Sequence, residues 1–124
     1  MRIKEVKGDG NCLFRSVSEQ LEGNENNHAF YREEAIKYMQ ANENDFKFFI
    51  EDDKTFENYI KDMAKDGTWG GNLEIQAMAM RFQVNFYIHI YNHPMYIVKN
   101  HDNPVRNMHL SYHDGVICIN IGAL

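Results

Sequence analysis

The residue of this sequence most suited to catalysis is a cysteine that directly follows a glycine-containing turn. Cys12 comes after Gly8-Asp9-Gly10-Asn11 and opens an apolar pattern that predicts a helix. A thiol at a helix N-terminus lies near unpaired N–H groups, which favour the thiolate and lower the pKa of the cysteine. The two glycines let the loop direct several N–H groups toward one point, an arrangement suited to a developing oxyanion. The segment predicts a nucleophilic cysteine, with Asp9 either orienting a histidine or shaping the loop.

An inert cysteine is the alternative interpretation of the same residues. In that case Asp9 and Asn11 are turn and cap residues, and Cys12 is a small core side chain. The other cysteine, Cys118, is expected in a buried strand, and two cysteines are too few for a disulfide framework. No metal site is expected, because the spacings of the histidines match no compact zinc motif. The choice between the two interpretations of Cys12 depends on the full string around it, residues 8–16.

Hydrophobic periodicity predicts the elements that position this segment. Four stretches of the first half repeat apolar residues at helical spacing: 12–22, 28–42, 56–63 and 75–82. Four stretches of the second half have strand character: 84–90, 95–99, 108–112 and 116–121. Thr55 is a suitable N-cap for the third helix, and Asn72 for the fourth. Helices followed by strands with short turns predict an α+β fold with a small, mostly antiparallel sheet.

Size and composition limit the classes of protein to which this chain can belong. Its 124 residues suit one domain, expected to span residues 1–124, with a core that needs no disulfides. No apolar run is long enough for a membrane span, and the first residues lack the apolar stretch of a signal peptide, so a cytoplasmic or nuclear protein is expected. The net charge of −5 argues against a nucleic-acid partner. We expect a monomer without a cofactor and without a membrane contact.

Three stretches of the sequence resemble parts of a known family. Residues 9–16 read Asp-Gly-Asn-Cys-Leu-Phe-Arg-Ser, which resembles without a mismatch the signature of the ovarian-tumour (OTU) family of cysteine proteases. Residues 68–77, Thr-Trp-Gly-Gly-Asn-Leu-Glu-Ile-Gln-Ala, resemble the second motif of that family, and residues 110–112 resemble the strand before its catalytic histidine. The likeness covers nearly the whole chain. It implies an OTU fold, a small central sheet flanked by helices with a papain-like arrangement of the active site.

The resemblance also implies an activity, which is hydrolysis of the isopeptide bond at the C-terminus of ubiquitin. Cys12 would attack the carbonyl and form a thioester, with ubiquitin or polyubiquitin as the partner. Trp69, Gly70 and Gly71 would line a channel for the slim Gly-Gly tail of ubiquitin, and Asn11 would bind substrate beside them. A packed aromatic at a helix start is the alternative interpretation of Trp69.

The far end of the chain departs from the family pattern. The family has a histidine, an aromatic residue and Asp or Asn at the start of its last strand, where this chain has Ile117, Cys118 and Ile119. His113, followed by Asp114, is the candidate replacement base, four residues earlier. A base must lie within ~3 Å of the nucleophile, and four extended residues span up to ~13 Å. His113 can therefore serve only if the connection before the last strand is rebuilt.

Three hypotheses about function remain open on the sequence alone. The leading one is a cysteine deubiquitinase with Cys12, Asp9 and His113 as its catalytic residues. The second is a catalytically impaired OTU module that binds ubiquitin without cleaving it, because Ile117 stands where the histidine is expected. The third is a scaffolding domain with neither property. An altered or truncated C-terminus would also explain the isoleucine.

Overall fold

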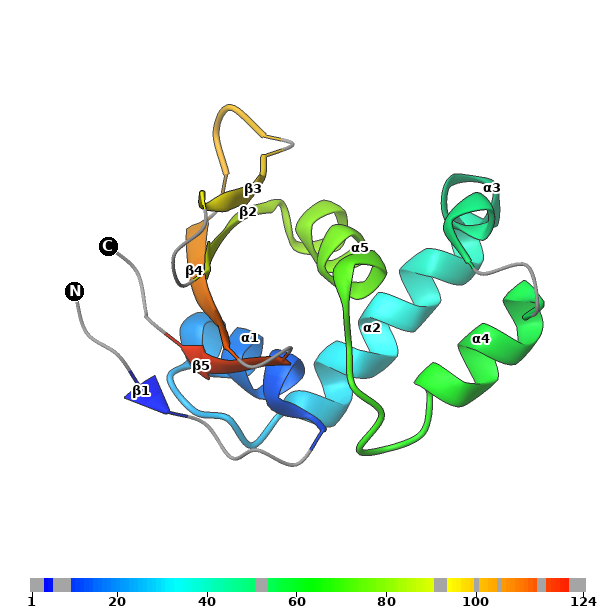
Figure 1. Ribbon diagram of the computed structural model, residues 1–124, viewed down its shortest axis with the longest axis horizontal. Coiled ribbons are helices and arrows are strands. Elements are labelled where there is room, and N and C mark those ends of the chain that lie inside the picture. Colours follow the sequence, from blue (N-terminus) through cyan, green and yellow to red (C-terminus); the bar gives the residue numbers. More distant parts are fainter. Residues whose placement is uncertain are drawn as a thin grey trace.

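In the computed structural model, a five-stranded sheet lies beside a group of helices (Figure 1). The structure describes residues 4–5, 10–50, 54–90, 94–99, 101–104, 106–113 and 116–120. For residues 4–5, 90, 112–113 and 116–120 it describes the backbone alone. Asp9, one of the candidate catalytic residues, lies outside the described residues, so its role stays a prediction.

The helices follow the apolar periodicity of the first half of the chain. They are α1 (Cys12–Glu22), α2 (His28–Ala41), α3 (Glu43–Phe46), the 3₁₀ helix η1 (Lys47–Phe49), α4 (Phe56–Met63) and α5 (Asn72–Phe82). Four of them confirm the predicted helices, while the short α3 and η1 are additional. Thr55 caps α4 as expected, because its hydroxyl accepts the Asn58 N–H at 3.1 Å. The cap predicted for α5 is wrong by one residue, because Asn72 is already helical and Gly71 is the N-cap.

The strands form a sheet of order β1-β5-β4-β2-β3. Their bounds are β1 (Lys4–Glu5), β2 (Val84–Ile90), β3 (Tyr96–Val98), β4 (Arg106–His113) and β5 (Val116–Asn120). Of the four pairings in the described part of the chain, three are antiparallel, whereas β2 and β4 run parallel. The parallel pair arises because the chain places β3 at the outer edge and then returns to add β4 on the other side of β2. The α+β class is confirmed, with a parallel pair inside the mostly antiparallel sheet.

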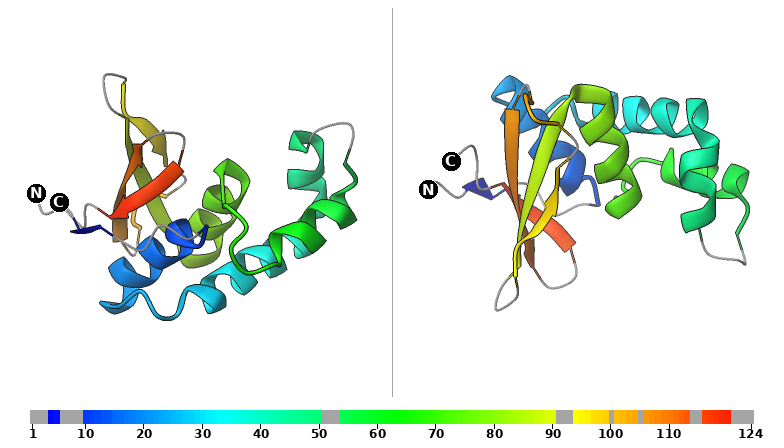
Figure 2. Two further views of the ribbon diagram at one scale, coloured as in Figure 1. Left: turned by 60° about the horizontal axis from the view of Figure 1, so that its bottom comes forward. Right: turned by 90° about the horizontal axis from the view of Figure 1, so that it is seen from above.

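The helices form a layer against the sheet and an arm that extends from it. In both views of Figure 2, α2 and α5 lie on one side of the sheet, and α3, η1 and α4 lie farthest from it. One apolar cluster joins the layers, with Phe14 of α1, Met39 of α2, Met78 of α5 and Phe86 of β2 all fully buried. Apolar burial stabilises a fold by ~25 cal/mol per Å². This packing holds the start of α1 in place, and with it the candidate nucleophile.

Candidate active site

Cys12 is the first residue of α1. The carbonyl of the preceding Asn11 accepts the Arg15 N–H at 2.8 Å, which is the first hydrogen bond of the helix. The N–H groups of a first helical turn have no acceptor within the helix, and no acidic side chain lies in the first turn of α1. The side chain of Cys12 is 1% exposed. The structure therefore places the thiol at a helix N-terminus, as the sequence predicts, but beneath the protein surface.

Gly10 lets the loop before Cys12 touch the loop before α5. Its φ is +82°, in the left-handed region that favours glycine. A Cβ atom at Gly10 would lie 1.9 Å from the carbonyl oxygen of Gly67, whose own φ is +85°. The two loops are thus in backbone contact, and any larger residue at Gly10 would separate them.

The side chain of Asn11 joins the same two loops. Its Oδ1 accepts the Gly67 N–H at 2.9 Å, and its Nδ2 donates to Asp66 Oδ1 at 3.2 Å. The Oδ1 also accepts a hydrogen bond from Arg32 Nη2 at 2.6 Å, and the whole residue is 2% exposed. The amide is therefore engaged inside the protein, and the substrate-binding role expected for Asn11 stays a prediction.

The aromatic-glycine segment continues from this junction toward α5. Trp69 is 48% exposed, so its ring is not a fully packed aromatic. A Cβ atom at Gly70 would lie 2.7 Å from Leu13 Cδ2, so a larger residue here would have to displace side chains of α1. A Cβ atom at Gly71 would meet only Glu74 Oε1, at an ordinary contact distance of 3.8 Å. The structure brings Gly70 against the helix that carries the thiol, and it leaves room for a Cβ atom at Gly71.

Glu74 holds the backbone at the end of this segment, a role that the sequence analysis above does not predict. Its Oε1 accepts the Gly71 N–H at 2.7 Å, and its Oε2 accepts the hydroxyl of Tyr59 at 2.5 Å. Burial raises the pKa of Glu74, while these hydrogen bonds and the positive charge of Arg32 act in the opposite direction. The sequence does contain a sign of this role. Glu74 is the third residue of the helix, and a glutamate at that position often accepts a hydrogen bond from the N-cap amide.

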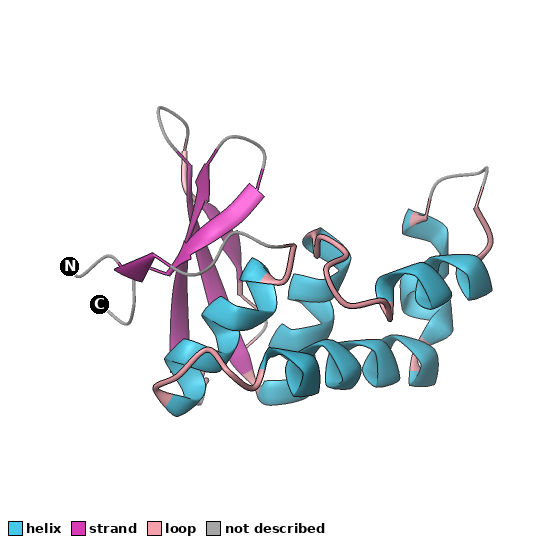
Figure 3. Cartoon of the chain, turned by 90° about the horizontal axis from the view of Figure 1, so that it is seen from below, coloured by secondary structure: helices cyan, strands magenta, loops and turns pink. Residues whose placement is uncertain are grey.

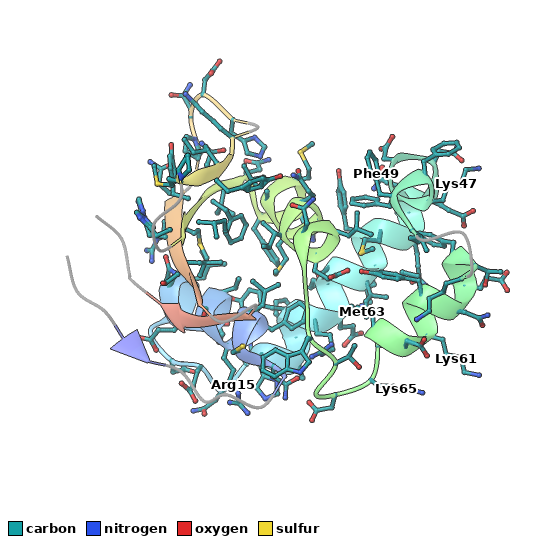
Figure 4. All side chains as sticks on the ribbon, viewed as in Figure 1. Arg15, Lys47, Phe49, Lys61, Met63 and Lys65 are labelled. Carbon is teal, nitrogen blue, oxygen red and sulfur yellow. The ribbon has the colours of Figure 1, made fainter. Side chains whose placement is uncertain are left out.

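Arg32 is the other residue whose role the sequence did not reveal. It is 4% exposed, and its guanidinium lies over the Phe14 ring at 4.4 Å from the centroid. Its Nη1 donates to the carbonyl of Met63 at 2.8 Å, and its Nη2 donates to that of Thr68 at 2.8 Å. Figure 4 labels Met63 at the end of α4, close to α2. The sequence shows only that this arginine stands next to Tyr31, one of the apolar residues of the predicted helix over 28–42.

The connection between β4 and β5 bears on the missing histidine. His113 ends β4 and pairs with Val116, the first residue of β5, while Ile117 pairs with Tyr112. One extra residue, Cys118, forms a bulge in β5 before the next pair. His113 and Val116 lie opposite each other in the strand pair, whereas a catalytic role for His113 would need the connection before β5 to be rebuilt. The side chain of His113 lies outside the described residues, so its role as a base stays a prediction.

The position of β5 shows which part of the chain meets α1. The two elements are in contact, and β5 begins on the side of the first turn of α1 in each view (Figures 1–3). The strand that contains residue 117, the position where the family histidine is expected, therefore contacts the helix that begins with Cys12. That both elements contribute to the candidate site stays a prediction.

Other kinds of site have little support in the described part of the chain. The histidines His89 and His109 pack together on the sheet, with Nε2 of the first 3.0 Å from Nδ1 of the second. Burial, and then the nearby His89, lower the pKa of His109. Among the described residues, no group of three or more His, Cys, Asp or Glu side chains is placed to hold a metal ion. None of the described helices is both long and apolar enough to cross a membrane.

Comparison with known proteins identifies the family. A family model described as OTU-like cysteine protease matches residues 7–116. The chain belongs to this family. The match to the OTU family ends at Val116, one residue before Ile117. The region of agreement therefore includes the Cys12 loop and the aromatic-glycine segment, and it stops where the histidine would stand.

Two curated OTU relatives show how much of a longer protein this domain represents. OVARIAN TUMOR DOMAIN-containing deubiquitinating enzyme 7 of Arabidopsis thaliana is 46% identical over 116 residues, which are 93% of this chain and 31% of that protein. OTU domain-containing protein 3 of Mus musculus is 40% identical over 116 residues, 93% of this chain and 29% of that protein. The OTU domain described here thus spans less than a third of the length of these relatives.

Solved structures confirm the OTU fold. The structure of the OTUD1 OTU domain has a TM-score of 0.83 and 24% identity, covering 94% of this chain and 83% of that one. An OTU domain in complex with ubiquitin has a TM-score of 0.80 and 20% identity, covering 94% of this chain and 67% of that one. The small sheet with its adjoining helices is therefore the fold that the resemblance implied.

Proposed function

We propose that this OTU domain is a cysteine isopeptidase that releases ubiquitin from lysine side chains, with Cys12 as its nucleophile. The observation that carries this proposal is the contact between two loops. The loop that delivers Cys12 to the start of α1 touches the loop that leads into Trp69 and the glycines after it. Two similar proteins support the choice of substrate, because one is named a deubiquitinating enzyme and the other is an OTU domain solved with ubiquitin.

The proposed reaction has two steps. The Cys12 sulfur attacks the carbonyl carbon of the last glycine of ubiquitin, and the oxyanion that forms is stabilised by N–H groups at the start of α1. Collapse of this intermediate breaks the C–N bond, and the lysine leaves as an amine after it receives a proton. Water then hydrolyses the thioester, which releases the ubiquitin carboxylate and regenerates the thiol. His113 is the proposed proton carrier, and Asp9 is the proposed residue that orients it.

The aromatic-glycine segment supports a substrate that ends in glycines. A Cβ atom at Gly70 would press on side chains of α1, whereas a Cβ atom at Gly71 would make only an ordinary contact with Glu74. Trp69, two residues before Gly71, is about half exposed. An exposed aromatic followed by two glycines suits a narrow, extended peptide, and the Gly-Gly tail of ubiquitin has that shape.

A second surface favours a protein substrate over a small molecule. A groove lined by Phe49, Met80 and Tyr96 begins at Asn72 and Leu73, directly after the aromatic-glycine segment. These three side chains are exposed, with Phe49, which Figure 4 labels, at 74%, while the half-buried Tyr38 and the buried Phe46 also line the groove. Contiguous exposed apolar side chains on a soluble domain usually mark a contact with another macromolecule. The body of ubiquitin is the proposed occupant when its tail lies at Gly71.

Covalent capture tests the nucleophile. Ubiquitin that carries a C-terminal thiol-reactive warhead should form one adduct with the folded protein at neutral pH, located at Cys12 by peptide mass analysis. Cys12→Ala should abolish the adduct, and Cys118→Ala, which removes the other thiol, should retain it. A folded protein that forms no adduct would contradict the proposal.

A catalytically impaired OTU domain that still binds ubiquitin is the second candidate. The observation that favours it is Ile117, whose backbone occupies its expected place in β5 with no histidine there. This candidate predicts binding of ubiquitin in a titration together with no cleavage of lysine-linked diubiquitin. The isopeptidase predicts both binding and cleavage, so the diubiquitin assay separates the two.

A further inference from the structure

Arg32 connects parts of the chain that are far apart in sequence. Its guanidinium donates to Asn11 Oδ1 at 2.6 Å and, more distantly, to the Gly10 carbonyl at 3.5 Å. It also donates to the carbonyls of Met63 and Thr68, both at 2.8 Å. One buried side chain of α2 therefore holds the loop before Cys12 and the two ends of the loop that follows α4.

The geometry of these contacts requires the shape of arginine. A guanidinium is a planar fork with five donors, whereas a lysine ammonium is a point charge on a flexible stem. Nη1 donates to the carbonyl of Met63 at the end of α4, and Nη2 donates to both Asn11 Oδ1 and the Thr68 carbonyl. The Phe14 ring, 4.4 Å away, lies against the guanidinium and restricts the orientation of the fork. Lysine at this position would reach one of these acceptors and leave others without their donor.

Asn11 extends the connection in the other direction. Its Oδ1 accepts from both Arg32 and the Gly67 N–H, while its Nδ2 donates to Asp66. The same loops touch at Gly10 and Gly67, where there is no space for a Cβ atom. The segment Trp69–Gly71 begins directly after Thr68, so the position of that carbonyl determines where the segment starts.

We propose that Arg32 is a positioning residue that sets the distance between the Cys12 sulfur and the segment Trp69–Gly71. This inference rests on the proposed isopeptidase function, in which the segment holds the tail whose carbonyl Cys12 attacks. Arg32 acts through Asn11 and Thr68 and touches neither substrate nor the reacting atoms. A misplacement of about 1 Å between a nucleophile and its target can cost roughly 100-fold in rate. Arg32 therefore contributes to the rate of attack rather than to the affinity for ubiquitin.

The test compares Arg32→Lys with the unaltered chain in the capture reaction. The rate constant at saturating ubiquitin probe should fall roughly 10- to 100-fold, while the concentration for half-saturation changes less than about threefold. Arg81→Lys is the matched control, because Arg81 is an exposed arginine of α5 paired with Glu34 at 2.8 Å. It should leave both values unchanged. An Arg32→Lys protein that captures the probe at the original rate would overturn the proposal.

Amide hydrogen exchange provides a readout that does not depend on catalysis. In folded Arg32→Lys, exchange at the Gly67 N–H and in residues 10–12 should accelerate while the centre of α5 stays protected. Unchanged exchange in both loops would also overturn the inference. If the unaltered chain forms no adduct, the isopeptidase function fails, and the exchange measurement alone then decides whether Arg32 holds the loops.

A second variant covers the case in which Arg32→Lys does not fold. Asp66 is exposed and bonds to Asn11 Nδ2, so Asp66→Ala weakens the same connection without opening the core. It should lower the saturating capture rate by a smaller factor, about 2- to 5-fold for the loss of one partly exposed hydrogen bond. It should also accelerate exchange at the Gly67 N–H. A normal capture rate and normal exchange in Asp66→Ala would contradict the proposal.

Discussion

The glycines near Cys12 differ in why each position needs glycine, and the structure separates these reasons residue by residue. Gly10 combines a φ of +82° with a backbone neighbour that leaves no space for a Cβ atom. Gly70 does not have a left-handed φ, but a Cβ atom there would meet the side chains of Leu13 and Phe14. Gly71 has an extended backbone and only a distant contact with Glu74. Gly10 is therefore a requirement of the fold, and Gly70 is a crowded position where a larger residue must displace side chains. Gly71 is the position that we assign to the substrate.

Alanine at Gly10 and alanine at Gly71 should therefore have opposite signatures. Gly10→Ala should lower the free energy of unfolding by more than ~1–2 kcal/mol, because the left-handed conformation alone costs that much. Gly71→Ala should unfold like the unaltered chain in urea and yet lose on the order of 10-fold in ubiquitin capture, because a methyl group would narrow the tail channel. Gly23→Ala, at another glycine with positive φ (+83°) and open surroundings, controls for backbone strain alone. A Gly71→Ala protein with normal capture would remove residue 71 from the proposed channel.

The sequence predicts some residues of the site and misses others for a physical reason. Cys12 and Trp69 stand in local strings, so their positions at a helix start and on an exposed loop follow from neighbours in sequence. Arg32 contacts Asn11, 21 positions away, and Glu74 contacts Tyr59, 15 positions away, in addition to the nearby Gly71. Such contacts depend on how α2, α4 and α5 pack, which periodicity alone does not specify.

At the scale of elements, Glu74 couples the start of α5 to α4 through a buried carboxyl. Burial raises the pKa of this group above its usual value of 4.5. A carboxyl with a raised folded pKa contributes stability below its unfolded pKa and loses it as pH rises through the folded pKa. Glu74→Gln removes the ionisation and retains an oxygen for the Gly71 N–H. We therefore expect the variant to gain stability relative to the parent as pH rises above about 4.5, with a plateau above the folded pKa.

Urea unfolding of the two proteins from pH 4.5 to pH 8 measures this difference. Glu57→Gln is the matched control, since it removes a carboxylate from an exposed position of α4. Glu74→Ala should behave differently, because it leaves the Gly71 N–H and the Tyr59 hydroxyl without this acceptor, at a cost of about 1–3 kcal/mol for a buried group. A stability difference between Glu74→Gln and the parent that stays constant across this range would show that the carboxyl does not titrate abnormally.

The elements themselves were predictable where one face of the segment is buried. Residues 12–22 and 56–63 give amphipathic helices with the predicted bounds, because their apolar stripes pack on the core. The short α3 and η1 escape prediction, since four and three residues are too few to establish a period. The parallel pairing of β2 with β4 is not predicted either, because strands joined by short connections usually pair antiparallel. Here β3 lies at the edge of the sheet, and the chain then crosses back to place β4 on the other side of β2.

At the scale of the whole molecule, the proposed site combines both ends of the chain. Cys12 begins the first helix, and Ile117 lies in the last strand, which contacts that helix. β5 pairs with β4 through Ile117 and Ile119, opposite Tyr112 and Ser111. The backbone at residue 117 therefore belongs to a paired strand, and we expect that strand to accept a histidine there. Whether His113 or residue 117 decides activity can be tested at these side chains.

If the parent has no working base, Ile117→His together with Ile119→Asp should raise the rate of diubiquitin cleavage by about 100-fold or more, because a positioned general base typically contributes 10²–10⁴-fold. The same pair of changes in Cys12→Ala should have no activity, which confines the gain to the thiol. His113→Ala is the complementary variant. If His113 is the base, this change abolishes cleavage by the parent, and the double variant gains little. If the parent is inert, His113→Ala changes nothing and the double variant gains cleavage. That result would identify Ile117 and Ile119 as the reason that a chain with a complete nucleophile loop does not turn over substrate.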